Sequence, residues 1–175
     1  MGGNPWHYFT PYQRDINEAL QNLREQEFRM GRYGFDYWFN QMSTNMQIGV
    51  TLNQSNRPAN ELIEQYGSVH EAIEALLDQS MPDGTQSILD MTHVSNQPED
   101  FAVCPLSEHE IREILQTTQP TRELIESLLL GEEAIDNWQP FEMFWDSIDR
   151  GTGRYIVLYQ EGEPTEIFFA GYSFD

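Results

Sequence analysis

A series of helix-start signals followed by a hairpin pattern most constrains the fold of this chain. Ser107-Glu108-His109-Glu110 is a capping box, in which the serine and the glutamate three residues later satisfy free N–H groups of a starting helix. Ser68-Val69-His70-Glu71 repeats the pattern. Near the end, residues 155–159 and 165–170 flank the turn 161–164 and read as the two strands of a hairpin. Capped helices followed by a hairpin are typical of an α+β fold.

The spacing of apolar residues predicts four to five helices packed on a small, mainly antiparallel sheet. We expect a single compact domain over residues 1–175, because no segment reads as a clear linker between two cores. Helices are expected from Pro11 to about Met30, after Ser68, after Ser107, after Thr121 and from Pro140, and extended segments at residues 3–9, 47–52, 87–91 and 101–104, before the C-terminal hairpin.

The composition fits a globular domain. With 175 residues the chain is long enough to bury a real core, and 39% hydrophobic residues exclude a disordered acidic tail. No apolar run approaches the roughly 18 residues that a membrane span needs. The single cysteine, Cys104, excludes an intramolecular disulfide and is expected to be a small buried hydrophobe.

The charge is unevenly distributed along the sequence. Residues 1–60 hold five acidic residues and five arginines, so the net charge of −20 belongs entirely to residues 61–175. All nine basic residues are arginines. This charge opposes direct binding to DNA, RNA or an anionic membrane. It is typical of a well-solvated acidic surface, or of an acidic face that meets a basic partner protein.

Two helix starts carry weak metal-ligand candidates. His70 and Glu74, and likewise His109 and Glu113, are four residues apart and would share a helix face. The apolar stripes of both helices place these pairs away from the buried face. The capping boxes already explain the acidic residues between them. We therefore predict no metal site and no cofactor.

Motifs of known catalytic chemistry are missing from the sequence. It has no G-x-S-x-G elbow and no phosphate-binding G-x-x-x-x-G-K-[ST] loop, and the absence of lysine excludes a Schiff base. No catalytic residue is predicted, and a non-catalytic protein is favoured. An enzyme that uses some of its many carboxylates is the alternative.

Aromatic residues are dense in the charge-balanced N-terminal third. Such residues fill a core or form a recognition surface, because tyrosine and tryptophan combine apolar area with a polar group. The candidates for ligand or partner binding are Trp6, His7, Tyr8, Tyr37 and Trp38.

Both ends of the chain show a resemblance to a known group of sequences. Residues 3–9 (GNPWHYF), 83–90 (DGTQSILD) and 169–175 (FAGYSFD) are similar to those of an uncharacterised family of bacterial proteins, including cyanobacterial ones. The resemblance implies a bacterial cytoplasmic protein and brings no catalytic motif.

Three functions fit these observations. The first is a non-catalytic interaction module, of the inhibitor or immunity-protein kind, whose acidic face binds a basic protein. The second is a small-molecule-binding protein with an aromatic pocket in the N-terminal third. The third is a carboxylate-based enzyme. We expect a cytoplasmic protein without membrane attachment, and the sequence predicts no oligomeric state.

Overall fold

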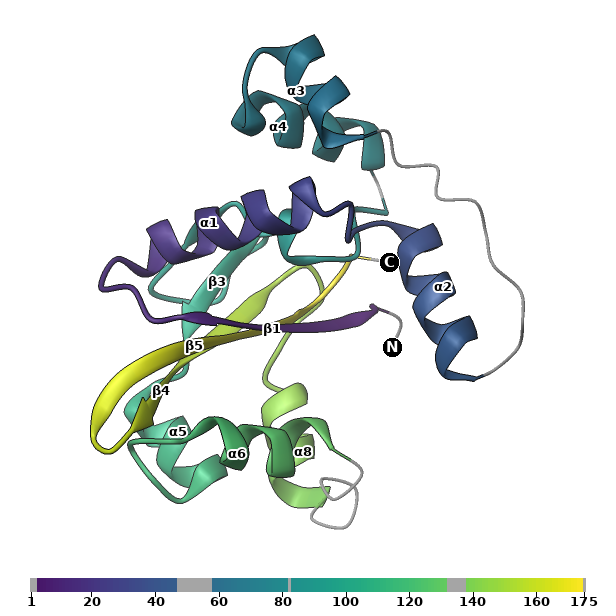
Figure 1. Ribbon diagram of the computed structural model, residues 1–175. Helices are drawn as coiled ribbons and strands as arrows, with labels where there is room; N and C mark the ends of the chain where they lie inside the picture. The colour runs from purple at the N-terminus through teal and green to yellow at the C-terminus, as the bar shows by residue number, and fades with distance from the viewer. Residues whose placement is uncertain (1–2, 47–57, 82, 132–137, 175) are drawn as a thin grey trace.

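The computed structural model describes residues 3–46, 58–81, 83–131 and 138–174. Its centre is a five-stranded mixed sheet in the order β1-β5-β4-β3-β2, with helices on both sides (Figure 1). The strands are β1 (Pro5–Pro11), β2 (His93–Val94), β3 (Ala102–Pro105), β4 (Gly153–Gln160) and β5 (Glu163–Tyr172). The helices are α1 (Ile16–Arg29), α2 (Phe35–Asn45), α3 (Ala59–Tyr66), α4 (Val69–Ser80), α5 (Glu108–Leu115), α6 (Arg122–Ile125) and α8 (Trp138–Trp145), with a 3-10 turn η1 (Ile88–Asp90) and a π-helical turn η2 (Glu126–Leu130).

The α+β fold is confirmed, but the sheet is less antiparallel than predicted. β5 pairs antiparallel with β1 and β4, whereas β3 pairs parallel with β4 and β2 pairs parallel with β3. The prediction of a mainly antiparallel sheet was therefore wrong. Helices α5, α6 and α8 connect β3 to β4, and such a helical crossover returns the chain in the same direction.

Two hydrophobic layers cover the two faces of the sheet. Consecutive strand residues point to opposite faces, so the fully buried Phe168 and Phe169 belong to different layers. Phe168 packs with Ile125 and Phe144 from the helices between β3 and β4. Phe169 packs in the same cluster as Leu20 of α1, on the opposite side of the sheet (Figure 1).

Helices α3 and α4 form a third layer on the outer side of α1 (Figure 1). Their cluster joins Leu62 of α3 and Ala72 of α4 to Phe28 at the end of α1. Leu89 of η1 completes this cluster, so the turn between α4 and β2 is anchored beneath the helices.

Three of the predicted helix starts are confirmed together with their side-chain caps, whereas the cap expected at Thr10 is wrong. Ser107 forms the full capping box with Glu110, and Thr121 accepts a hydrogen bond from Leu124 N. Ser68 accepts from Glu71 N at 3.1 Å. The predicted hairpin is β4–β5.

Other local predictions were wrong, for identifiable reasons. The described residues contain seven α-helices, more than the four to five predicted, because α2 and α3 are short and lie next to segments rich in aromatic or polar residues, where their apolar spacing was not recognised. Helix α1 begins after Asp15 because Thr10 is part of β1. Residues 87–91 form η1, capped by Ser87, instead of a strand. The strand expected at 47–52 lies outside the described residues.

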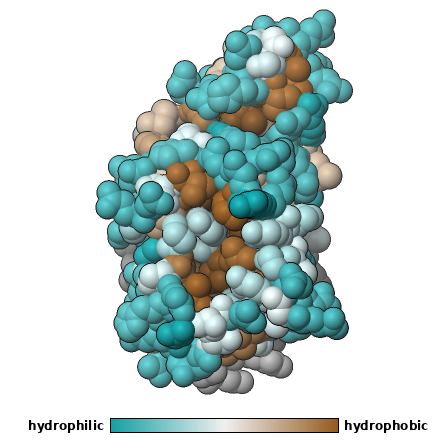
Figure 2. All heavy atoms as spheres, turned by 90° about the vertical axis from the view of Figure 1, so that its left-hand side faces the viewer, coloured by the Kyte–Doolittle hydropathy of each residue, from teal (hydrophilic) through white to brown (hydrophobic). Residues whose placement is uncertain are grey.

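Hydrophobic atoms reach the surface on the side that carries the β4–β5 turn. Figure 2 shows them as a brown band framed by hydrophilic side chains. Ile16, Val94 and Tyr155 line a shallow groove between α1 and β4, and Tyr155 also lines a second groove together with Ile111 and Val157. Among the described helices, none combines the length and the apolar composition of a membrane span.

Candidate functional site

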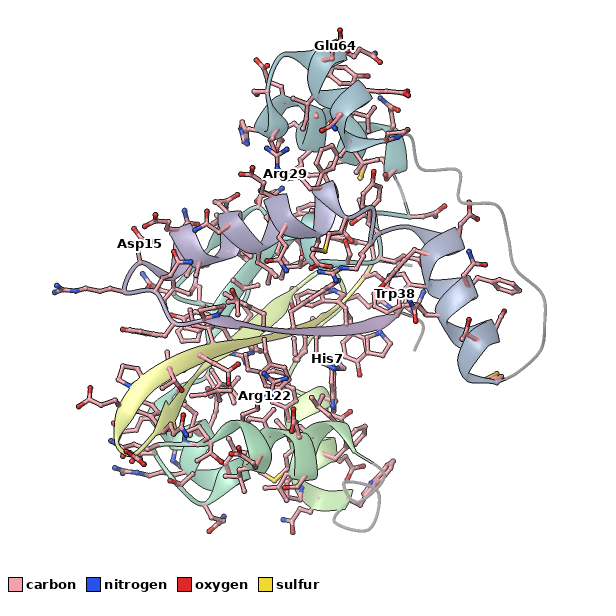
Figure 3. All side chains as sticks on the ribbon, in the orientation of Figure 1. His7, Asp15, Arg29, Trp38, Glu64 and Arg122 are labelled. Carbon is pink, nitrogen blue, oxygen red and sulfur yellow. The ribbon has the colours of Figure 1, made fainter. Side chains whose placement is uncertain are left out.

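A groove of about 480 Å³ follows the outer edge of β1 from Pro5 to Phe9. One wall comes from α1, the segment after it and the start of α2, and the other wall carries Arg122 of α6. Figure 3 shows His7 on the side of β1 that faces Arg122, while Trp38 approaches from α2. The groove therefore lies between two helical layers, where a further strand of the sheet would lie.

The structure brings all five predicted binding residues into this groove. Three come from β1 and two from α2, which the intervening helix α1 separates in sequence. Their role in binding stays a prediction, but their common location is a finding. These residues are Trp6, His7, Tyr8, Tyr37 and Trp38.

The register of β1 decides which main-chain groups face the groove. Just beyond its two ends, Asn4 O accepts a hydrogen bond from Ser173 N, and Tyr12 N donates one to Thr165 O of β5. In an antiparallel pair, residues alternate between facing the partner strand and facing away from it. The even-numbered residues therefore bond to β5, and His7 and Phe9 direct their N–H and C=O groups into the groove.

Prolines limit the free edge to a short stretch. Pro5 and Pro11 have the same outward orientation as His7 and Phe9, but they have no N–H group. Only His7 and Phe9 thus present outward N–H donors, and these main-chain groups have no hydrogen-bond partner in the described part of the chain. Flanking prolines are a common way to restrict unwanted pairing at a sheet edge.

Trp6 forms the base of the groove where β1 crosses the sheet. It is 1% exposed, and its ring lies so close to Gly171 that a Cβ atom there would be 2.2 Å from Cζ2. A glycine is thus required at position 171. The indole Nε1 of Trp6 is buried without a hydrogen-bond partner among the described residues.

An ion pair between a buried carboxylate and a partly exposed guanidinium lies next to Tyr8. Glu27 is 2% exposed and accepts hydrogen bonds from Nε of Arg32, at 2.8 Å, and from its Nη2. Burial, together with the negative charge of Glu27, raises the pKa of Tyr8, so its hydroxyl stays protonated. The hydrogen bond to Glu27 raises the pKa of Arg32. This wall is therefore polar but electrically balanced.

Trp38 is fixed in position by the segment that precedes η1. Its indole Nε1 donates to the carbonyl oxygen of Gln86 at 2.6 Å, and its ring makes an edge contact with Tyr37 at 5.2 Å between centroids. Gly34, with φ of +80°, allows the turn that starts α2, and its N–H donates to Thr85 O. The aromatic side chains of α2 are thus tied to the body of the protein.

Arg122 covers the opposite wall. Its guanidinium lies 4.1 Å from the ring centre of Phe9 and pairs with Glu126 and Glu166 at 2.8 Å each. His7 lies beside Phe168 on this side, and partial burial lowers the pKa of its imidazole. The imidazole of His7 is therefore uncharged at pH 7, because burial lowers its pKa below the ordinary value of 6.5.

The weak metal candidates are not brought together. His70 and Glu74 are on α4, whereas His109 and Glu113 are on α5, on the other side of the sheet (Figure 1). Glu74 instead lies 3.7 Å from Arg24. Among the described residues, no group of three or more His, Cys, Asp or Glu is arranged to hold a metal ion.

The cysteine lies in the core, as predicted. Cys104 is 1% exposed in β3, and its Sγ accepts a hydrogen bond from Arg154 at 3.2 Å. Burial raises the pKa of the thiol. The thiolate that nucleophilic chemistry requires is therefore disfavoured.

Sequence reasoning missed three charged residues of the groove. Glu27 and Arg32 are five residues apart across the end of α1, a spacing that does not indicate a helical pair. Arg122 approaches β1 from more than a hundred positions later in the chain, so no local signal connects it to Phe9. The only hint was the equal number of acidic residues and arginines in residues 1–60.

Comparisons with protein-family models, with curated proteins and with solved structures give no match. The geometry itself therefore carries the functional argument. The groove offers two main-chain donors with their carbonyl oxygens, aromatic faces and a balanced ion pair, which suit binding better than proton transfer or nucleophilic attack.

Proposed function

We propose that the protein is a non-catalytic binding module that takes an extended peptide segment of a partner protein along β1. The observation that carries the proposal is that the outward main-chain groups of His7 and Phe9, inside an aromatic groove, have no hydrogen-bond partner among the residues that the structure describes. A peptide strand added to a sheet edge gains affinity from main-chain hydrogen bonds and specificity from alternate side chains.

The shape of the groove favours a strand over a compact ligand. It runs along the strand from Pro5 to Phe9, with walls on both sides of the sheet. Alternate side chains of an added strand would point toward Trp38 on one side and toward Arg122 on the other. A second copy of this chain would bring a hollow edge against a hollow edge, and such surfaces fill each other poorly.

The charges and rings predict the chemistry of the bound segment. Tyr37 and Trp38 offer apolar area, and Glu27 is already paired with Arg32. The surrounding residues 1–60 carry no net charge. We therefore propose a segment with apolar or aromatic side chains and little net charge, whose binding depends weakly on salt.

A peptide selection tests this proposal. Peptides of about ten residues would be selected from a random library against the wild-type protein. Two variants then separate the main chain from the side chain. His7→Ala and His7→Pro both remove the imidazole, but only His7→Pro removes the outward N–H. Proline already occurs at outward positions 5 and 11 of the same strand.

Selected peptides are expected to bind His7→Ala nearly as tightly as wild type, and His7→Pro about tenfold more weakly, because a peptide carbonyl loses its donor. Hydrogen exchange should show new protection of the His7 and Phe9 amides in wild type. Equal binding by both variants, protection elsewhere, or a library without enrichment would each reject the proposal.

The acidic surface supports a second proposal, a basic protein partner. It rests on the net charge of −20 in residues 61–175, whose acidic residues occur on helices on both sides of the sheet. Binding of this kind falls steeply with salt. Salt dependence therefore distinguishes the two interactions. A cytoplasmic location belongs to the same proposal.

A further inference from the structure

A second cavity lies beneath α4, outside the β1 groove. It has a volume of about 270 Å³, comparable to the liquid volume of about nine water molecules. Carboxylates and rings share its lining. Glu74 and Asp78 lie one turn apart on α4, Asp90 ends η1, and Phe101 and Phe174 form an aromatic side.

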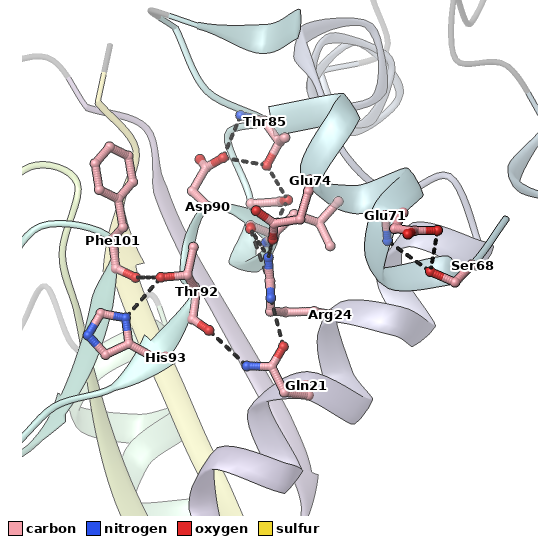
Figure 4. A network of polar contacts seen from close by, with 12 residues as sticks. Gln21, Arg24, Ser68, Glu71, Glu74, Thr85, Asp90, Thr92, His93 and Phe101 are labelled. Atoms are coloured by element: carbon pink, nitrogen blue, oxygen red, sulfur yellow. Dashed lines mark hydrogen bonds and ion pairs between the residues drawn. The ribbon is translucent and has the colours of Figure 1, made fainter. Parts of the chain in front are cut away.

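Asp90 lines this cavity and has one unsatisfied carboxylate oxygen, which is buried. The residue is 2% exposed, and its Oδ1 accepts hydrogen bonds from Thr85 N and Thr85 Oγ1, both at 2.7 Å. Oδ2 is buried and makes no hydrogen bond with the described residues. In Figure 4 this second oxygen points away from Thr85, toward the side on which Phe101 stands. Asp90 and Phe101 line the same cavity.

Gly84 keeps the space beside this oxygen open. Its φ is +72°, and a Cβ atom at this position would lie 2.9 Å from Asp90 Oδ2. Any other residue would therefore combine a strained backbone with a clash against the carboxylate. The loop around Asp90 thus holds the carboxyl group in place and leaves one of its oxygens without a donor.

The nearest buried cation is committed to other groups. Arg24 donates two hydrogen bonds to Leu89 O, at 3.3 and 3.1 Å, and a third to Gln21 at 2.7 Å. Its ion pair is with Glu74, and no ion pair within 4.0 Å joins it to Asp90 in the described structure. Burial raises the pKa of Asp90, although hydrogen bonds from Thr85 and from the main chain of Ser87 and Gln86 oppose this effect. A buried carboxylate without a cation is costly, so a bound cation would stabilise it.

The remaining lining indicates which kind of cation fits. Phe101 and Phe174 lie 4.6 Å apart between ring centres, and aromatic faces attract organic ammonium and guanidinium groups. Leu77 adds apolar surface for a short hydrocarbon chain. A bare metal ion fits less well, because the described residues contain no group of three suitable ligands. The net charge of −20 raises the local concentration of any cation.

We propose that the cavity beneath α4 binds a small organic cation, a protonated primary amine or a guanidinium group, with Asp90 as its counter-charge. Glu74 and Asp78 stand at its acidic rim, and the two phenylalanines hold the hydrocarbon part. The site is independent of the β1 groove and takes ligands of different chemistry.

The probes are n-butylammonium and n-butylguanidinium, with n-butanol as a neutral ligand of similar shape. We expect saturable binding of at least one cation in a nuclear magnetic resonance titration, with the amide shifts centred on Gly84, Asp90 and Phe101. Butanol should bind at least about tenfold more weakly, because a charge-assisted hydrogen bond is lost.

Three variants make the test specific. Asp90→Asn should weaken cation binding about tenfold, and Asp78→Asn, an exposed rim change that does not threaten folding, about threefold. Asp83→Asn is the matched control, because it removes an exposed charge of the same loop outside the cavity lining and should leave affinity unchanged.

Three results would overturn the proposal. One is the absence of saturable cation binding to the wild type, and another is equal binding of butanol. The third is an equal loss of affinity in Asp83→Asn and Asp78→Asn, because it would mean that cations respond only to the overall charge. The cation could also belong to an arginine side chain of a partner protein. In that case a short arginine-containing peptide should compete with the free cation for the cavity.

Discussion

Glu27 in the β1 groove and Asp90 beneath α4 are both carboxylates with 2% exposure, but their surroundings differ. Glu27 has a dedicated cation, Arg32, within hydrogen-bond distance. Asp90 has hydroxyl and main-chain donors on one oxygen and none on the other. The carboxylate of Glu27 thus has a cationic partner within the folded chain, whereas one oxygen of Asp90 has no partner among the described residues.

Because of this difference, the two regions suit ligands of different chemistry. In the groove, the main-chain groups of His7 and Phe9 point outward without a hydrogen-bond partner among the described residues, so an extended strand fits. In the cavity, the unsatisfied atom is Oδ2 of Asp90, so a cation fits. Unpaired buried or edge groups, more than composition, indicate the ligand chemistry.

The largest change in stability is expected from removing Arg32, the partner of Glu27. Arg32→Ala leaves Glu27 buried without a cation and should lower the free energy of unfolding by about 3 kcal/mol. Urea denaturation measures this change. Arg29→Ala is the control, since its pair with Glu25 is exposed and should contribute less than about 0.5 kcal/mol. Similar losses in both variants would mean that Glu27 is better solvated than its burial indicates.

The next largest change in stability concerns Asp90 and depends on pH. Burial raises the pKa of Asp90 above its ordinary value of 3.8, so the folded protein holds the proton more tightly than the unfolded chain. The free energy of unfolding therefore falls as pH rises from 3.8 through the raised pKa, and the loss is complete above it. Among the described residues, the charged groups that face this site are Arg24 of α1 and Glu74 and Asp78 of α4.

Asp90→Asn removes this titration while keeping an acceptor for Thr85. Urea denaturation of both proteins at about pH 4 and about pH 7 should show the wild type losing stability relative to the variant at the higher pH. A difference that does not change with pH, or that changes in the opposite direction, would contradict the argument.

A smaller change in stability is expected from a substitution in α4, which should affect ligand binding at only one of the two sites. Ser68→Ala removes the cap of α4 and should cost about 1 kcal/mol of stability. It should weaken cation binding beneath α4 and leave peptide binding at β1 unchanged, as titrations of both ligands would show. Ser80→Ala, which removes only a bond to Leu76 O at the other end of α4, is the matched control. Equal changes at both sites would argue against their independence.

The smallest effect is expected at the exposed wall of the groove. Arg122→Ala removes the cation above Phe9 and two exposed ion pairs, and should lower stability by less than about 1 kcal/mol. Thermal denaturation measures this change, with Arg112→Ala on α5 as a control for an exposed pair without a ring contact. A loss as large as that of Arg32→Ala would show that the two walls are not distinct.

Local signals in the sequence predicted the elements better than their arrangement. Ser107 and Thr121 cap helices because a cap depends only on a side chain and the next three residues. The segment with Ser87 failed as a strand because the same kind of side-chain bond nucleates a 3-10 turn. Helix α2 was not predicted because its aromatic residues line the groove as well as contacting the core, so they are not confined to one face of the helix.

The sequence by itself determined the capped helices, the C-terminal hairpin, the buried cysteine and the gathering of aromatic residues near the N-terminus. All of these depend on neighbours within a few positions. The tertiary structure decided that β1 is an edge strand, that Arg122 meets Phe9, and that Asp90 is buried with no ion pair among the described residues. These features depend on pairing and packing between distant segments, and a pattern of neighbouring residues does not determine which distant partners meet.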